Sequence, residues 1–324
     1  MKLLIPGGAG YIGSHMVKYA QECGHEVVVL DDFSTGHEWA IKDCEVLRVN
    51  LLDQDKLAQL LKGLSFDGVI HFAAKSLVGE SVQQPDVYYR NNVVGTLNLV
   101  NEMINNDIHN LVFSSTAAIF GNPITEKIAE DHPKNPINPY GQSKLMVENM
   151  LRDICAVHGI NATCFRYFNA AGADPSGSIG EAHDPETHLI PNILKSMISG
   201  GSSLKVFGND YETPDGTCVR DYVHVTDLAQ AHLLGLEHMK HNRGFSAFNL
   251  GNGSGFSVLD VIRSCERVVK NTIPHDLDFR RAGDPARLVA DSSAAIREIS
   301  WEPKFSDLDT LIESAWRWHT SLNI

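Results

Sequence analysis

Tyr140 and Lys144 are the residues whose types and spacing most clearly suggest chemistry, in the sequence Tyr-Gly-Gln-Ser-Lys. Side chains at positions i and i+4 share one face of a helix. A phenol with an ordinary pKa of about 10 is protonated at neutral pH, and a nearby ammonium group favours its phenolate form. The spacing therefore predicts a group that donates and accepts protons, although it also arises by chance, so its neighbours decide its meaning.

A glycine-rich turn stands at the start of the chain. Gly7, Gly10 and Gly13 form a G-x-x-G-x-x-G pattern between a short apolar run and an amphipathic segment. Such glycines let the backbone approach a pyrophosphate at the N-terminus of a helix. Asp31 ends the next apolar run, where a carboxylate accepts a ribose 2′-OH and repels a 2′-phosphate. The pattern predicts NAD rather than NADP.

Small hydroxyl residues, Ser114, Ser115 and Thr116, end another apolar run. Open α/β sheets bind ligands at the carboxyl ends of their strands, so these hydroxyls are expected near the cofactor. A hydroxyl, a phenol and a lysine around a nicotinamide can remove the proton of an alcohol while hydride leaves its carbon.

These groups need a scaffold, and the first half of the chain alternates short apolar runs with longer amphipathic ones, which is typical of a parallel sheet covered by helices. We expect an α/β fold, with a doubly wound Rossmann-type parallel sheet and a smaller mixed α/β C-terminal domain. The predicted strands are 2–5, 26–30, 45–49, 68–72, 110–115 and 161–166, and the predicted helices are 12–23, 55–62, 86–107 and 139–158. After about residue 170 the alternation weakens. The expected division is a cofactor domain at 1–170, joined by a returning segment near 217–245, and a substrate domain at 171–324.

Composition narrows the functional class. The formal charge of −13 argues against a nucleic-acid partner, and no apolar run approaches the length of a membrane span. Six widely spaced cysteines without a CxxC motif suit a reducing, cytoplasmic location. Two histidine pairs, His183 with His188 and His238 with His241, have near-ligand spacing but no third ligand at a standard spacing, so no metal is expected.

The chain resembles the extended short-chain dehydrogenase/reductases and, among them, the UDP-glucose 4-epimerases. Residues 7–13 and 140–144 carry the wider resemblance. The matches more specific to the epimerases lie at 78–81, 166–169, 207–211, 215–217, 219–222 and 281–284. The resemblance implies an enzyme that holds NAD tightly, oxidises C4 of a UDP-hexose to a 4-keto sugar and returns hydride to the opposite face.

The resemblance also implies a role for each matching residue. Tyr140 is the base and then the acid, Lys144 holds the ribose and lowers the tyrosine pKa, and Thr116 hydrogen-bonds the reacting oxygen. Besides Tyr140 and Lys144, the implied NAD-binding residues are Gly7, Gly10, Tyr11, Ile12, Gly13, Asp31, Asn50, Leu51, Phe72, Ala73, Asn91, Ser114 and Tyr167. The implied UDP-sugar residues are Thr116, Asn169, His188, Leu189, Phe207, Arg220, Tyr222, Arg281, Asp284 and Leu288. Helices 86–107 and 139–158 resemble those that pair in a homodimer.

Several alternatives stay open at this point. Leu288 aligns with the position whose bulk controls entry of N-acetylated sugars, so UDP-GlcNAc and UDP-GalNAc remain candidate substrates, as does a UDP-uronate. A 4,6-dehydratase is disfavoured because Ala117 and Ala118 follow Thr116 in place of an acidic pair. A regulator that binds NAD without turnover is disfavoured by the intact Thr116, Tyr140 and Lys144.

Overall fold

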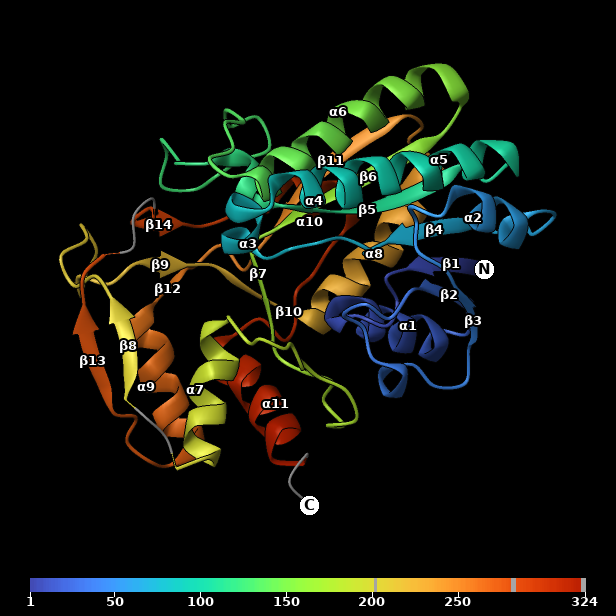
Figure 1. Cartoon of the computed structure of the whole chain (residues 1–324). Helices are drawn as coiled ribbons and strands as arrows, with labels where there is room; N and C mark the ends of the chain where they lie inside the picture. The colour runs from blue at the N-terminus through green and yellow to red at the C-terminus, as the bar shows by residue number, and fades with distance from the viewer. Residues whose placement is uncertain (201–202, 281–283, 322–324) are drawn as a thin grey trace.

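A seven-stranded parallel sheet, in the order β11-β6-β5-β4-β1-β2-β3, forms the centre of the computed structural model, which describes residues 1–200, 203–280 and 284–321 (Figure 1). Its strands are β1 (Lys2–Pro6), β2 (Glu26–Asp31), β3 (Glu45–Arg48), β4 (Gly68–His71), β5 (Asn110–Thr116), β6 (Asn161–Tyr167) and β11 (Phe245–Leu250). The α/β class is confirmed, and the six predicted strands agree to within one residue at each end. β11 was not predicted as a strand, and it completes one edge of the sheet beside β6.

Both faces of this sheet are buried, because successive apolar side chains along a strand point alternately to one face and the other. Leu3 and Ile5 belong to one core cluster, and Leu4 between them belongs to the other. The period of two along a strand sends successive side chains to opposite faces, so a continuous apolar run indicates helices on both sides. The first face packs against α1 (Tyr11–Glu22), α8 (Val225–Met239) and α10 (Ser293–Ile299), and the second against α2 (Gln54–Leu61), α5 (Gly95–Asn105) and α6 (Pro139–His158).

Helix α6 begins and ends where its sequence specifies. Pro139 occupies the first turn, and the Asn138 side chain accepts the Gly141 N–H at 2.9 Å. Gly159 ends the helix with a positive φ of 68°, which glycine adopts without a steric penalty. The helix predicted at 86–107 is instead three consecutive pieces: α4 (Pro85–Tyr88), a π-helical segment (Tyr89–Val94) and α5. Helix α3 (Val78–Gln83) precedes them.

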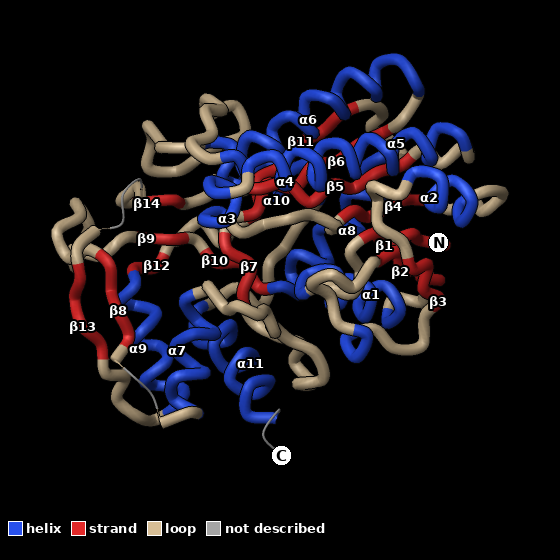
Figure 2. Tube along the Cα trace, in the orientation of Figure 1, coloured by secondary structure: helices blue, strands red, loops and turns tan. Residues whose placement is uncertain are grey.

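A second, smaller group of elements follows β6. Its core lies among α7 (Leu189–Ile198), α9 (Val258–Val269) and α11 (Leu308–Ser321). Figure 2 shows its short strands away from the large sheet: the pairs β8 (Leu204–Phe207) with β13 (His275–Asp278) and β7 (Asn169–Ala171) with β10 (Tyr222–His224), and the group β9 (Val219–Arg220), β12 (Phe256–Ser257) and β14 (Arg287–Leu288). The described residues also form 3-10 helices at Glu38–Ala40 and Ala117–Phe120. In the part of the chain that the structure describes, no helix has the length and apolar character needed to cross a membrane.

A buried ion pair joins α6 to the sheet. Arg166 of β6 donates two hydrogen bonds to Glu148 at 2.7–2.9 Å, and their side chains are only 2% and 0% exposed. The Ser115 hydroxyl of β5 also donates to Glu148, at 2.6 Å. Removing one member of such a pair leaves an uncompensated charge in the core.

We therefore expect Glu148→Ala to lower the free energy of unfolding by about 3–5 kcal/mol, because Arg166 then loses its partner. Urea unfolding measures the change. Glu237→Ala, which removes an exposed pair with Lys240, is the matched control and should cost less than about 1 kcal/mol. Equal effects of the two substitutions would contradict the anchoring role of Glu148.

Candidate active site

The candidate site lies where the strand order reverses, between β1 and β4. The chain leaves β1 for α1 on one face, whereas β4 and β5 extend the sheet the other way, so the loops after β1 and β4 border a crevice. The Pro6 carbonyl accepts the N–H groups of Phe72 and Ala73 at 2.8 and 3.0 Å. A Cβ atom on Gly7 would lie 2.3 Å from the Ala73 nitrogen, so only glycine permits this contact.

The glycine turn presents the start of α1 to the crevice. Gly10 supplies no side-chain cap, so the first backbone N–H groups of the helix remain able to bind an anion. A Cβ on Gly13 would lie 2.1 Å from the Gly7 carbonyl oxygen, so this glycine allows the helix to pack against the turn. The Asp31 carboxylate accepts the N–H groups of Ala9 and Phe33 at 3.0 and 2.8 Å, which fixes it beside the turn. Burial raises the pKa of Asp31, and these hydrogen bonds oppose that rise.

The crevice continues into a cleft of about 1110 Å³. It brings together twenty of the residues singled out from the sequence: Gly7, Gly10, Tyr11, Ile12, Gly13, Asp31, Asn50, Leu51, Phe72, Ala73, Asn91, Ser114, Thr116, Tyr140, Lys144, Tyr167, Asn169, His188, Asp284 and Leu288. Leu189, Phe207, Arg220 and Tyr222 are not among the described residues that line it. Arg281 lies outside the described residues.

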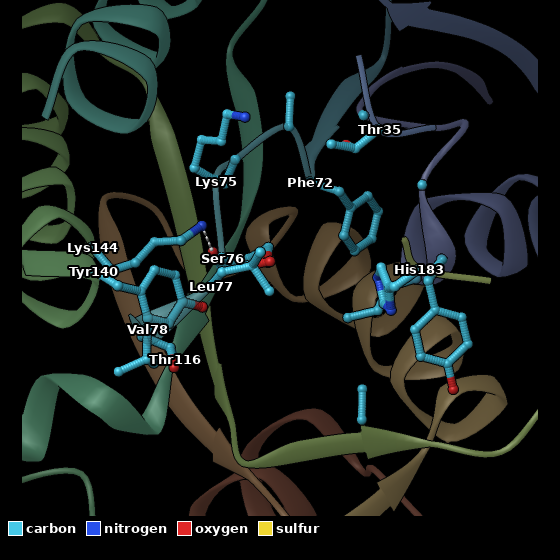
Figure 3. Close-up of a pocket in the computed structure, with 18 of the residues that line it drawn as sticks. Thr35, Phe72, Lys75, Ser76, Leu77, Val78, Thr116, Tyr140, Lys144 and His183 are labelled. Atoms are coloured by element: carbon cyan, nitrogen blue, oxygen red, sulfur yellow. Dashed lines mark hydrogen bonds between the residues drawn. The ribbon is translucent and has the colours of Figure 1, made fainter. Parts of the chain in front are cut away.

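The three candidate catalytic side chains converge at one wall of the cleft. Tyr140 and Lys144 project from the first turns of α6, and Thr116 ends β5 (Figure 3). The Lys144 ammonium donates to the Ser114 carbonyl at 2.8 Å and lies 4.7 Å from the centre of the Phe113 ring. The backbone of β5 thus holds the lysine behind the tyrosine.

Burial has the largest effect on the pKa values of Tyr140 and Lys144. Burial lowers the pKa of Lys144 to about 7. It raises the pKa of Tyr140, and a hydrogen bond with Thr116 opposes that rise. The shift in the Tyr140 pKa comes from burial and Thr116, and the lowering by Lys144 that the resemblance implies stays a prediction. Desolvation disfavours both charged forms, because Lys144 is buried and Tyr140 is partly buried.

Arg220, which does not line the cleft, contacts two residues that do, and Asn169 is held within the lining by a hydrogen bond. Arg220 donates to the Pro285 carbonyl at 2.9 Å and to Asp284 at 3.3 Å, and both of these partners line the cleft. The Asn169 amide donates to the Asp221 carbonyl at 2.7 Å. Tyr222 is buried within the core of the smaller group of elements.

Sequence reasoning missed part of the opposite wall. Glu181 and His183 line the cleft there, with His183 across from Tyr140 in Figure 3. Glu186 hydrogen-bonds His188 at 3.0 Å from just behind them. The spacing of the two histidines was visible in the sequence, but nothing in it indicated that both glutamates turn toward them. Lys75 and Ser76, in the loop after β4, also line the cleft.

Known proteins are similar to this chain over nearly its whole length. Residues 3–251 match the model of the NAD dependent epimerase/dehydratase family. A UDP-glucose 4-epimerase of Halalkalibacterium halodurans is 48% identical over 98% of this chain and 96% of its own length. One of Lactobacillus helveticus is 48% identical over 99% and 98%. The crystal structure of UDP-glucose 4-epimerase from Brucella ovis in complex with NAD superposes with a TM-score of 0.94, at 45% identity over 97% of each chain.

The identity and coverage of these matches extend over both groups of elements, so they include the cofactor crevice and the wall formed by Asp284 and Leu288. The chain belongs to the NAD dependent epimerase/dehydratase family and, within it, to the UDP-glucose 4-epimerases, which act on C4 of a UDP-hexose with NAD.

Proposed function

We propose that this protein reversibly converts UDP-galactose and UDP-glucose through a 4-keto sugar. The observation that carries the proposal is the presence of Tyr140, Thr116 and Lys144 together in the lining of one continuous cleft (Figure 3). The cleft extends from the glycine turn to Asp284 and Leu288. Its volume of about 1110 Å³ exceeds the roughly 300–1,000 Å³ of a pocket for one drug-sized molecule, which suits a dinucleotide and a nucleotide sugar together.

The residues at the crevice fit NAD. The uncapped start of α1 suits the pyrophosphate, and a Cβ on Gly10 would meet only the Gly7 carbonyl, at 3.4 Å, so the turn is open on its ligand side. Asp31, with Asp32 beside it, suits a ribose hydroxyl and repels a 2′-phosphate. When bound, NAD supplies the hydride acceptor for the oxidation of C4 and the donor for the return.

The protein's own residues move the proton. Tyr140 takes the proton of the C4 hydroxyl during oxidation and gives one back during reduction, and Thr116 orients the reacting oxygen. Lys144, held by the Ser114 carbonyl, stabilises the phenolate when it is charged. Because the two half-reactions are reversals of each other, one acid/base group serves both.

The far end of the cleft suits the UDP group. The contact of 3.3 Å between Arg220 and Asp284 is partly exposed, so it can be broken. The Arg220 guanidinium can then bind a diphosphate. Ala118 lines the cleft and Ala117 precedes it, so these two positions offer no acid or base for eliminating water. Epimerisation is therefore favoured over dehydration.

The decisive experiment incubates the purified, NAD-loaded protein with UDP-galactose and couples product formation to UDP-glucose dehydrogenase. UDP-glucose should accumulate to an equilibrium that is also reached from the opposite direction. An absence of product from NAD-loaded protein would overturn the proposal. UDP-GlcNAc, tested in parallel with detection of UDP-GalNAc, determines whether Leu288 admits an acetamido group.

Tyr140→Phe should lose on the order of 10² or more in turnover, because it removes the proton-transfer group while keeping the ring. Its NAD content should stay close to that of the unaltered protein. Tyr19→Phe, on α1 and outside the lining of the cleft, is the matched control and should keep full activity. Near-normal turnover in Tyr140→Phe with full NAD content would refute the assigned role.

Lys144 should also make stability depend on pH. Its pKa is about 7 in the folded protein and 10.5 when exposed, so between these values the unfolded chain binds more protons and rising pH stabilises the fold. Between pH 7 and 9 the free energy of unfolding should rise relative to that of Lys144→Met, by up to about 1.4 kcal/mol per unit. Urea unfolding of both proteins after NAD removal measures this. The exposed Lys240→Met should parallel the unaltered protein, and a parallel profile for Lys144→Met would contradict the shift.

We further propose a cytoplasmic homodimer, with residues 1–170 and the returning segment near 217–245 as the cofactor domain and the rest of 171–324 as the substrate domain. The dimer is supported by the outer surface of the π-helical segment, α5 and α6. Val94, Leu97 and Met146 are 45%, 37% and 40% exposed there, and the π-helical segment packs beside α6 (Figure 1). The wide spacing of the six cysteines supports the reducing location.

Leu97→Glu should convert the dimer to a monomer, because a buried glutamate at the interface would lack a partner. Light scattering should give about twice the chain mass of 35.7 kDa for the unaltered protein and about that mass for the variant. Ile296→Glu, on α10 and even more exposed at 52%, should remain dimeric. A monomer mass for the unaltered protein excludes the interface.

A further inference from the structure

Four side chains from one short stretch converge on the wall of the cleft that faces Tyr140. We call Glu181, His183, Glu186 and His188 the His-Glu cluster. Each contributes one ligand atom, and these atoms all lie within 4.8 Å of one another. The roles proposed above for NAD and the UDP-hexose use His188 at most, so the gathering of all four is not explained by the epimerase reaction.

The spacing of the four atoms matches that of ligands around one small cation. His188 Nδ1 lies 2.8 Å from Glu181 Oε1 and 3.0 Å from Glu186 Oε1. His183 Nδ1 lies 3.1 and 4.0 Å from the same two oxygens. Tetrahedral zinc with bonds of about 2.0–2.1 Å holds its ligand atoms about 3.3–3.4 Å apart, within the range observed here. Small side-chain rotations would bring all four atoms to that distance.

The charge of the cluster also favours a cation. The carboxylates of Glu181 and Glu186 are only 5% and 6% exposed, and buried charges require a counter-charge. Lys195 lies 3.4 Å from the outer oxygen of Glu186. Among residues 1–200, 203–280 and 284–321, no lysine or arginine pairs with Glu181, and its side-chain partners are the two imidazoles. One N–H on His188 Nδ1 cannot point well at both carboxylates, whereas a central ion can bind both.

We propose that the His-Glu cluster binds one divalent transition-metal ion, with zinc as the best match. Two imidazole nitrogens and two carboxylate oxygens are typical zinc ligands, whereas calcium and magnesium prefer ligands that are all oxygen. The ion takes the place of the proton on each Nδ1 atom, and each imidazole binds it in the neutral form, with its remaining proton on Nε2. The ion takes no part in hydride or proton transfer at C4.

The role of this site is to fix one wall of the cleft. The His183 ring packs edge-on against Tyr11 with ring centres 5.9 Å apart, and the Tyr11 hydroxyl donates to the Gly172 carbonyl at 2.6 Å. The Glu181 carbonyl accepts the indole N–H of Trp318 in α11 at 3.2 Å. A metal ion would therefore connect the cofactor end of the cleft with the smaller group of elements.

Metal binding to the NAD-loaded protein, treated with a chelator and then dialysed, tests this proposal without reference to turnover. Titration with Zn²⁺ should show one equivalent bound with a Kd on the order of 1 μM or tighter. Co²⁺ should give the intense visible absorption of a tetrahedral complex, which Zn²⁺ then removes. His188→Gln and Glu186→Gln should each weaken Zn²⁺ binding by about 10-fold to 100-fold or more. His241→Gln, an exposed histidine elsewhere, is the matched control and should bind as the unaltered protein does.

Three results would overturn the site: no saturable Zn²⁺ binding, Co²⁺ bound without a tetrahedral spectrum, or affinity unchanged in both ligand variants. The NAD content and circular dichroism of each variant show whether it is folded. If one variant fails to fold, the other and the Co²⁺ spectrum of the unaltered protein still decide the question. A protein that binds zinc in this way but does not convert UDP-galactose would leave the metal site standing and remove only the proposed function.

Discussion

The loop after β1 rests directly on the loop after β4, and the rest of the site depends on this contact. With Gly7 against the backbone of Ala73, there is no room for a side chain between the two loops. The contact fixes the direction in which α1 leaves the sheet, and therefore where its N-terminus points. It also fixes Phe72 and Ala73 on one side of the cofactor crevice. The sheet provides the crevice because its strand order reverses there, and the glycine keeps the crevice narrow.

One face of α6 connects that crevice to the chemistry. Tyr140, Lys144 and Glu148 follow one another at intervals of four, so they lie along one side of the helix. Glu148 is bound by Ser115 of β5 and Arg166 of β6, and Lys144 by the Ser114 carbonyl of β5. The ion pair and the lysine therefore hold Tyr140 at the end of β5, beside Thr116. The same burial that makes this anchoring rigid also shifts the pKa values of Tyr140 and Lys144.

Much of this arrangement could be predicted because it is encoded locally. Strands β1, β2, β4 and β5 each contain a short apolar run, and α6 has a proline at its start and a glycine at its end. The π-helical segment before α5 could not be foreseen, because its residues do not differ in helical pattern from their neighbours. The position of Arg220 behind Asp284 could not be foreseen either, because these two residues are 64 apart in the sequence and meet only after β9 and β14 pair.

The sequence by itself determined the cofactor crevice, the acid/base pair and the family, because each depends on a few residues at fixed spacing within one turn or one helix. Only the tertiary structure decided how those residues are charged and what faces them. Desolvation depends on everything packed around a group, so the pKa values of Lys144 and Tyr140 follow from the fold rather than from their spacing. The gathering of Glu181 and Glu186 around two histidines likewise depends on the path of a loop that carries no regular pattern.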